Sequence, residues 1–125
     1  MLARGIIGEL RYRRSKNSNR HFECVFCSPG APVHERPVIY ENASMLVVRN
    51  DFPYKTWSGL RVSEHLLVIP KRHLLKVDEF SKSEQIDFAE LLADQDNNGY
   101  SFYLRSHSDT YRSVGHVHGH LFKFK

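Results

Sequence analysis

The chain has 125 residues, of which 41% are hydrophobic and 26% charged, and a formal net charge of +4. This length supports one domain with its own core and leaves no room for a second. The excess charge lies in residues 1–21, where six basic residues face one acidic residue, so that residues 22–125 carry a net charge of −1. We therefore predict a basic N-terminal arm over 1–21 and a single domain over 22–125.

Hydrophobic runs in the chain are short. None approaches the ~18 residues that a transmembrane helix needs. No signal peptide precedes the first cysteine. We expect a cytoplasmic protein that makes no membrane contact, and the basic arm is the one segment that could touch nucleic acid.

The only two cysteines, Cys24 and Cys27, form a C-x-x-C pair. In a reducing compartment this spacing indicates a metal site or a redox motif. Redox motifs of this type open a helix, whereas Ser28-Pro29-Gly30 follows here, so a metal is the better interpretation. Zinc takes four ligands, and histidines would supply the other two. The candidates are nearby (His21, His34) or distant (His73, His116), and spacing alone does not choose between them.

The hydrophobic pattern predicts one helix among several strands. Runs rich in β-branched and aromatic residues predict strands over 38–42, 44–49, 65–70, 101–105 and 114–124, with a polar loop over 55–64. Ser81 and Glu84 form a capping-box signature, and the helix after it should end near Ala93. Its expected apolar face consists of Ile86, Phe88, Ala89, Leu91 and Leu92. The fold class is therefore α+β, an antiparallel sheet of about five strands with one main helix packed on it.

Three histidines alternate with other residues near the end of the chain. On a strand, His116, His118 and His120 would share one face, and Val117, Gly119 and Leu121 would point into the core. Neutral imidazoles can attack phosphorus, move protons or bind a metal. One interpretation assigns His116 to a metal and leaves His118 and His120 as a nucleophile and a proton shuttle, without choosing which is which. The alternative is a single metal bound by all three histidines, which would leave the cysteines in need of separate partners.

Four segments resemble the histidine-triad (HIT) family of nucleotide hydrolases and transferases. His116 to Phe122 resembles the family's alternating histidine signature, and Cys24 to Cys27 is similar to its N-terminal C-x-F-C. Asn50 to Tyr54 is similar to its N-x-x-P-Y turn, and His65 to His73 to its strand block ending in I-P-K-x-H. The resemblance extends from Cys24 to the C-terminus.

The resemblance implies a HIT-like fold and a reaction at the α-phosphate of a nucleoside phosphate, phosphoramidate or dinucleoside polyphosphate. The reaction would be hydrolysis or nucleotidyl transfer through a nucleotidyl-histidine intermediate. The implied catalytic residues are His118, His120 and His65. The implied nucleotide-binding residues are Asn50 toward the ribose hydroxyls, Ser113 toward the α-phosphate, and Val38, Ile39 and Val48 around the base. A structural zinc ion would be bound by Cys24, Cys27, His73 and His116. A homodimer is a further expectation.

Three residues depart from the family pattern. Gly119 stands where an apolar side chain is usual, Arg105 where many relatives have asparagine, and Arg112 where glutamine is common. Because arginine binds phosphate through paired hydrogen bonds, Arg105 and Arg112 suggest a more anionic substrate. Either guanidinium could instead pair with Asp109 or Glu64.

Three other functions remain open from the sequence. One is a non-catalytic nucleotide-binding module, in which Gly119, Arg105 and Arg112 have reduced the catalytic activity. Another is a hydrolase that processes DNA or RNA ends (a deadenylating enzyme, for example) and holds the nucleic acid with the basic arm. The third is a metalloenzyme with its catalytic metal on the three histidines.

Overall fold

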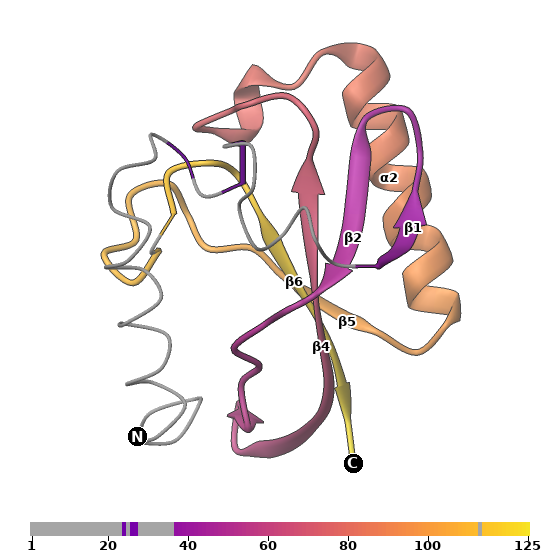
Figure 1. Ribbon diagram of the computed structural model, residues 1–125, viewed down its shortest axis with the longest axis vertical. Helices are drawn as coiled ribbons and strands as arrows, with labels where there is room; N and C mark the ends of the chain where they lie inside the picture. Colours follow the sequence, from indigo (N-terminus) through magenta and orange to yellow (C-terminus); the bar gives the residue numbers. More distant parts are fainter. Residues whose placement is uncertain (1–23, 25, 28–36, 113) are drawn as a thin grey trace.

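The computed structural model describes Cys24, Phe26, Cys27, residues 37–112 and residues 114–125 (Figure 1). The predicted arm, together with His21, His34 and Ser113, lies outside the described residues. The elements are β1 Val38–Glu41, β2 Met45–Arg49, β3 Thr56–Trp57, β4 Leu60–Pro70, the 3-10 turn η2 Val77–Glu79, α2 Lys82–Asn97, β5 Ser101–Tyr103 and β6 Gly119–Phe124.

The predicted α+β class is confirmed. In the described part of the chain an antiparallel sheet of six strands has the order β1-β2-β4-β6-β5, and β3 pairs with β4. Helix α2 packs along one side of this sheet (Figure 1). Within the same residues, no helix combines the length and the apolar character that crossing a bilayer requires.

The side chains of the central strand β4 point alternately to the two faces of the sheet. Its residues His65 to Pro70 are all buried, because β2 and β6 pair with it on either side. Alternation along β4 sends Leu66 and Val68 toward the helix, and His65, Leu67 and Ile69 to the other face. We call this second face the histidine face.

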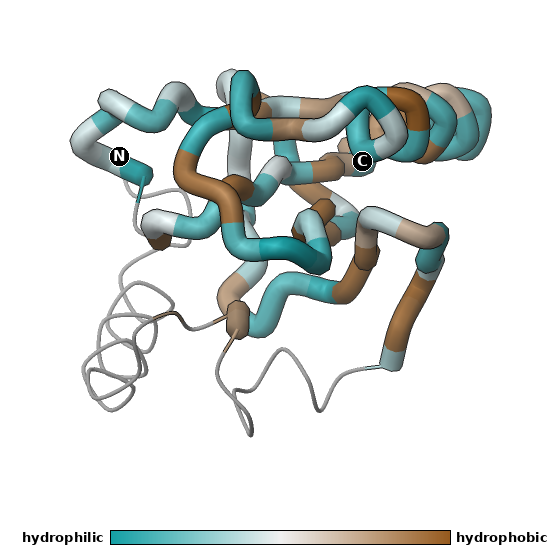
Figure 2. The backbone as a smooth tube through the Cα atoms, turned by 90° about the horizontal axis from the view of Figure 1, so that it is seen from above, coloured by the Kyte–Doolittle hydropathy of each residue, from teal (hydrophilic) through white to brown (hydrophobic). Residues whose placement is uncertain are grey.

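The helix side holds the main core. Its buried residues are Met45, Val47, Leu66, Val68, Leu74, Phe80, Leu91, Val117 and Leu121. Viewed from above, hydrophobic stretches are interleaved with hydrophilic ones along the chain, as strands with one buried face require (Figure 2). The predicted apolar helix face is only partly right: Leu91 is buried, whereas Ile86 is 58% exposed.

The helix is longer than predicted. The capping box is present, since the Ser81 side chain accepts a hydrogen bond from the Glu84 amide and the Glu84 side chain accepts one from the Ser81 amide. The helix ends at Asn97 instead of Ala93. The apolar period stops at Leu92, but Gln95 is buried and extends the packed face with a polar side chain.

A hairpin replaces the loop predicted over 55–64. Strand β3 pairs with the start of β4, with Thr56 opposite Arg61 and Trp57 opposite Leu60. The two residues between them both have positive φ, 52° at Ser58 and 77° at Gly59. This combination matches the right-handed twist of a two-residue hairpin. The Ser-Gly pair was a turn signal that the polar composition of the segment obscured.

The last strand is shorter than predicted. It begins at Gly119 instead of Val114, so His116 and His118 lie in the segment leading into β6. The predicted alternation nevertheless holds, because Val117 and Leu121 lie in the helix-side core. The backbone before Gly119 is bonded elsewhere: the Val117 amide donates to the Leu74 carbonyl at 2.7 Å.

An ion pair joins the end of β4 to the start of α2. Arg72 donates to both carboxylate oxygens of Glu84, with Nη2–Oε1 at 2.8 Å and Nε–Oε2 at 3.2 Å. The hydrogen bond from Arg72, followed by that from the Ser81 amide, lowers the pKa of Glu84 to about 2. Arg72 precedes His73, so this pair also anchors a candidate metal ligand.

We expect Glu84→Gln to lower the free energy of unfolding at pH 7 by about 1 kcal/mol, the usual upper size for a partly exposed pair. Because the folded-state pKa of Glu84 is below its ordinary value of 4.5, its stabilisation is complete above pH 4.5 and is lost as the pH falls toward 2. Urea unfolding at several pH values measures this. The difference between wild type and variant should shrink below pH 4.5, and a difference independent of pH would contradict the assignment.

Candidate functional site

Three buried histidines meet on the histidine face. His65 lies on β4, His120 on β6, and His118 in the segment that enters β6. Each is less than a tenth exposed. The rings of His118 and His120 lie 5.4 Å apart between centroids, and those of His65 and His120 lie 5.1 Å apart. The sheet register explains this grouping, because His120 lies opposite Leu67, two residues from His65.

The tautomer of His118 follows from one hydrogen bond. Its Nδ1 lies 2.9 Å from the carbonyl oxygen of His116. A carbonyl can only accept, so Nδ1 carries the proton and Nε2 keeps its lone pair. Burial, the largest cause, lowers the pKa of His118 to about 4. The ring is therefore neutral near pH 7, and Nε2 is available as a nucleophile.

A second chain of hydrogen bonds orients His65 and His120. The Tyr54 amide donates to Nδ1 of His65 at 3.1 Å, so the neutral His65 ring carries its proton on Nε2. That nitrogen lies 2.8 Å from Nδ1 of His120 and donates to it. The neutral His120 ring then carries its proton on Nε2, where it can be given to another atom. Two neighbouring rings thus have opposite roles: His118 offers a lone pair and His120 a proton.

Asn50 lies beside His65. Its Oδ1 accepts from the Phe52 amide at 2.8 Å, and its Nδ2 lies 3.4 Å from Nδ1 of His65. The same residue ends the pairing of β2 with β4, since its amide donates to the His65 carbonyl at 3.0 Å. Asn50 therefore helps to fix the turn that orients His65, and its contact with a ribose stays a prediction.

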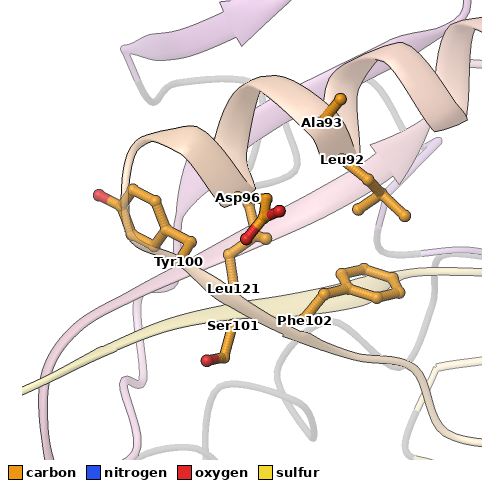
Figure 3. A pocket seen from close by; sticks show the side chains of 7 residues that line it. All are labelled: Leu92, Ala93, Asp96, Tyr100, Ser101, Phe102 and Leu121. Carbon is orange, nitrogen blue, oxygen red and sulfur yellow. The ribbon is translucent and has the colours of Figure 1, made fainter.

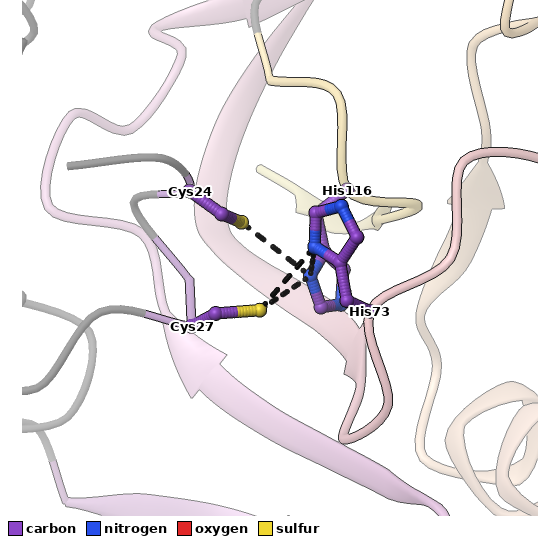
Figure 4. Close-up of side chains that lie close together, drawn as sticks. All are labelled: Cys24, Cys27, His73 and His116. Carbon is purple, nitrogen blue, oxygen red and sulfur yellow. Dashed lines mark hydrogen bonds between the residues drawn. The ribbon is translucent and has the colours of Figure 1, made fainter.

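Four predicted metal ligands converge next to this site. Cys24, Cys27, His73 and His116 each offer a donor atom, and these atoms all lie within 4.8 Å of one another (Figure 4). The thiols come from Cys24 and Cys27, which together with Phe26 are called here the knuckle. His73 comes from the segment after β4, and His116 from the segment before β6. This is the distant pair of histidines that spacing could not select, while His21 and His34 lie outside the described residues.

The spacing of these donors fits a tetrahedral zinc ion. Bonds of ~2.3 Å to sulfur and ~2.05 Å to nitrogen place sulfur and nitrogen ligands ~3.6 Å apart and two nitrogens ~3.3 Å apart. Here Sγ of Cys24 lies 3.5 Å, and Sγ of Cys27 3.3 Å, from Nδ1 of His116. Nδ1 of His73 lies 3.3 Å from Sγ of Cys27 and 3.2 Å from Nδ1 of His116.

The surroundings of His116 also suit a metal ligand. Its Nε2 lies 2.8 Å from the Pro70 carbonyl and donates to it, which leaves Nδ1 deprotonated and aimed at the cysteines. Partial burial, followed by the neighbouring Cys24, raises the pKa of Cys27 to about 11. Two thiols so close together ionise together only beside a cation, so the donor set matches the chemistry of a zinc site.

The knuckle brings the Phe26 ring onto His118. The Phe26 ring makes edge-on contacts with His118 at 5.2 Å and with His116 at 5.7 Å between centroids. It also packs against the apolar cluster of Val48, Leu67 and Ile69. The residue between the two cysteines thus shields one side of His118, a role that the sequence did not reveal.

Arg112 binds backbone carbonyls. Its Nη1 donates to the Leu75 carbonyl at 2.9 Å, its Nη2 to that of Gly115 at 3.0 Å, and its Nε to that of Val114 at 3.1 Å. These bonds join the segment after His73 to the segment before His116. Its predicted contact with phosphate stays a prediction, as does that of Ser113, which lies outside the described residues.

Arg105 pairs with Asp109, one of the two acidic partners expected from the sequence. The two side chains are 3.3 Å apart, and both are largely buried. The guanidinium also lies against the rings of Trp57, Tyr103 and Tyr111. Its predicted contact with a nucleotide stays a prediction.

The three residues predicted to wall the base are spread over two strands. Val38 and Ile39 are exposed on the edge strand β1, and Val48 is fully buried on β2. Val48 lies opposite Leu67, which in turn lies opposite His120. Strand β4 therefore separates Val48 from His120, and the role of all three residues toward a base stays a prediction.

Packing explains why residue 119 is a glycine. A Cβ atom added there would overlap the ring of Phe102, which lies across β6 on the helix side. Phe102 lies on β5, opposite Leu121 on β6, and its ring also packs against Phe88. The glycine therefore makes room for an aromatic ring, and the departure from the family pattern is compensated by a neighbour.

We expect Gly119→Ala to destabilise the fold by ~1–3 kcal/mol, because the added methyl group overpacks the contact with Phe102. Combining it with Phe102→Leu, which removes the clashing ring edge, should restore part of the loss. A double-mutant cycle measured by thermal unfolding tests this. Strictly additive effects would show that the two residues do not interact.

One surface groove lies on the other side of the sheet. It is lined by Leu92, Ala93, Asp96, Tyr100, Ser101, Phe102 and Leu121 (Figure 3). The groove runs between α2 and β5 and includes no histidine or cysteine. It offers none of the nucleophilic or metal-binding groups found on the histidine face.

Comparisons with known proteins agree on the fold. No protein-family model matches the chain, and no curated protein matches it. Among solved structures, a HIT family hydrolase from Clostridium thermocellum is 21% identical with a TM-score of 0.55, over 79% of this chain and 88% of that one. A HIT family hydrolase from Legionella pneumophila is 19% identical with a TM-score of 0.51, over 88% and 89%.

A third structure is a zinc-bound histidine triad family protein from Mycobacterium smegmatis. It is 23% identical with a TM-score of 0.52, over 79% of this chain and 73% of that one. At these identities the shared property is the fold. The predicted HIT-like architecture is therefore confirmed.

Proposed function

We propose that this chain, which has the histidine-triad fold, is a nucleotide hydrolase or nucleotidyl transferase that acts at the α-phosphate of its substrate. One observation carries the proposal: Nδ1 of His118 donates to a carbonyl, so the buried, neutral ring offers Nε2 as a nucleophile. The resemblance of the surrounding motifs supplies the substrate class.

In the first step, the lone pair on Nε2 of His118 attacks the α-phosphorus. A nitrogen–phosphorus bond forms while the bond from phosphorus to the leaving group breaks. The leaving atom takes the proton that His120 carries on Nε2, and the Nε2 proton of His65 moves onto Nδ1 of His120 along their 2.8 Å hydrogen bond. Solvent returns a proton to His65, so that neither ring becomes an anion. The products are the free leaving group and a nucleotidyl-His118.

In the second step, water or another acceptor attacks the same phosphorus. His120, now lacking the proton on Nε2, accepts the proton of the attacking group, and the nitrogen–phosphorus bond returns its electrons to His118. With water the product is a nucleoside monophosphate, and with another acceptor it is a transferred nucleotide.

A zinc ion held by Cys24, Cys27, His73 and His116 would be structural, because all four of its positions would be filled by protein. Its chemistry would be to crosslink the knuckle to the segment after β4 and the segment before β6. The crosslink would also hold two contacts of His118 in place, because the knuckle carries Phe26 and because His116 supplies the carbonyl that orients His118. No proton or phosphoryl group passes through the metal.

Trapping the intermediate tests the proposal. The protein is mixed with adenosine 5′-phosphoramidate or diadenosine tetraphosphate, quenched in base to preserve nitrogen–phosphorus bonds, digested and examined by mass spectrometry. We expect an added nucleotidyl mass on the peptide that contains His118, together with release of nucleoside monophosphate. Binding of these nucleotides without turnover or adduct would instead indicate a non-catalytic nucleotide-binding module.

A further inference from the structure

A group of aromatic side chains surrounds Arg105 at the edge of the sheet. Its members, called here the aromatic cluster, are Trp57 on β3, Tyr103 on β5, Tyr111 and Arg105. The Arg105 Cζ lies 5.6 Å from the ring centroid of Trp57, 5.7 Å from that of Tyr103 and 5.9 Å from that of Tyr111. Trp57 and Tyr103 touch each other, with centroids 4.8 Å apart. One guanidinium thus lies among three rings.

The sheet register connects this cluster to the proposed proton donor. Tyr103 on β5 lies directly opposite His120 on β6. Residues opposite each other in an antiparallel pair project from the same face, so Tyr103 flanks His120 on the histidine face.

A continuous series of rings makes the same connection from the β3 side. Tyr54 stacks on His120 with centroids 5.6 Å apart and on Trp57 with centroids 5.7 Å apart. Phe122 stacks on Trp57 at 5.2 Å. The aromatic cluster therefore lies next to the ring of His120, on the side away from the predicted zinc ligands.

Exposure and charge indicate a binding surface. Tyr111 is 79% exposed and Tyr103 36% exposed, although both belong to a group built around a largely buried arginine. Asp109 balances part of the charge of Arg105 and holds it in place at 3.3 Å. Exposed ring faces next to a fixed guanidinium favour a planar, electron-rich ring that carries negative charge.

We propose that the aromatic cluster is the subsite for the leaving group and selects leaving groups that combine an aromatic ring with negative charge. The inference rests on the proposed function, in which His118 attacks phosphorus and His120 gives its proton to the leaving atom. A group that leaves next to His120 extends over Tyr103 and Trp57. Its ring stacks on the exposed tyrosines, and its charge faces Arg105.

Three adenosine 5′-phosphate derivatives with different leaving groups test this subsite. They are the phosphoramidate, whose leaving group is ammonia, the ester of 2-naphthol, and the ester of a naphthol sulfonate. The phosphorus–oxygen bond of each ester breaks as His118 attacks, and the naphthol leaves with the proton from His120. Values of kcat/KM are compared as ratios within each variant, which cancels effects common to all three substrates.

We expect Tyr111→Ala to lower the ratio of either naphthyl ester to the phosphoramidate about tenfold, the loss of one stacking contact. Arg105→Gln should lower the ratio of the sulfonated to the plain naphthyl ester by a similar factor. Ile86→Ala is the matched control, because this side chain is 58% exposed on α2, on the other side of the sheet. Its ratios should equal those of the wild type.

The outcomes separate the two proposals. If the wild type hydrolyses none of the three substrates and forms no adduct on His118, the proposed function fails. If all three are hydrolysed but the ratios in Tyr111→Ala and Arg105→Gln stay within twofold of wild type, the leaving-group subsite is wrong. Tyr111 is so exposed that its variant should fold even if Arg105→Gln does not.

Discussion

Replacing His118 with alanine should abolish turnover while the fold is kept. The side chain that attacks phosphorus is lost, and no other described histidine has an unprotonated nitrogen at the same place, since Nδ1 of His120 is used by His65 and Nδ1 of His116 faces the cysteines. We expect kcat to fall by at least ~10³-fold, the usual effect of removing a covalent nucleophile. Steady-state hydrolysis of adenosine 5′-phosphoramidate measures this loss.

His107→Ala provides the matched control. It makes the same substitution at an exposed histidine in the polar segment before Arg112, and we expect activity close to that of the wild type. Thermal unfolding of both variants checks that the fold is intact. Substantial turnover by a folded His118→Ala protein would assign the nucleophile to another residue.

Removing zinc should strongly destabilise the protein. Four ligands from three separated segments converge within 4.8 Å, so an ion there would crosslink the knuckle to the segments after β4 and before β6. Free zinc at a thousand times its dissociation constant adds ~4 kcal/mol to the free energy of unfolding. We therefore expect a chelator, or Cys24→Ser, to lower the melting temperature by many degrees and to remove zinc from the protein.

A loss of activity should accompany the loss of zinc. Without the crosslink, Phe26 is no longer held against His118, and His116, whose carbonyl orients the nucleophile, loses its fixed position. Zinc content by atomic absorption and melting by calorimetry, measured on the same samples, test the crosslink, with His107→Ala again as control. One zinc per chain is expected. Two zinc ions would revive the metalloenzyme with metal on the three histidines, and unchanged melting of the zinc-free protein would rule out a structural ion.

The chemistry of the site was visible in the sequence because each motif is short. Alternation alone puts His118 and His120 on one face of a strand, and the capping box alone starts the helix at Ser81. The apolar run from His65 to Pro70 identifies the central strand in the same way. These features depend on neighbours within a few residues. The structure agrees on the start of the helix and on the central strand, whereas the last strand begins at Gly119, after His118.

Errors in the prediction occurred where a distant contact overrides local character. The segment 55–64 is polar and was predicted to be a loop, yet it pairs as a hairpin next to the aromatic cluster. The helix continues past its apolar residues because Gln95 is buried. Gly119 looked like a weak point of the motif, and the ring of Phe102, 17 positions earlier in the chain, occupies the space.

By itself, the sequence determined the fold class, the position of the triad and the set of possible metal ligands. Only the tertiary structure brings the distant pair of candidate ligands together, because the sheet and its connections place Nδ1 of His73 3.2 Å from Nδ1 of His116 across 43 positions of the chain. It also decided the protonation of each ring, since a tautomer depends on the partner of the other nitrogen: a carbonyl for His118, and the Tyr54 amide for His65. The protonation of each ring thus depends on its hydrogen bonds, which the order of residues does not contain.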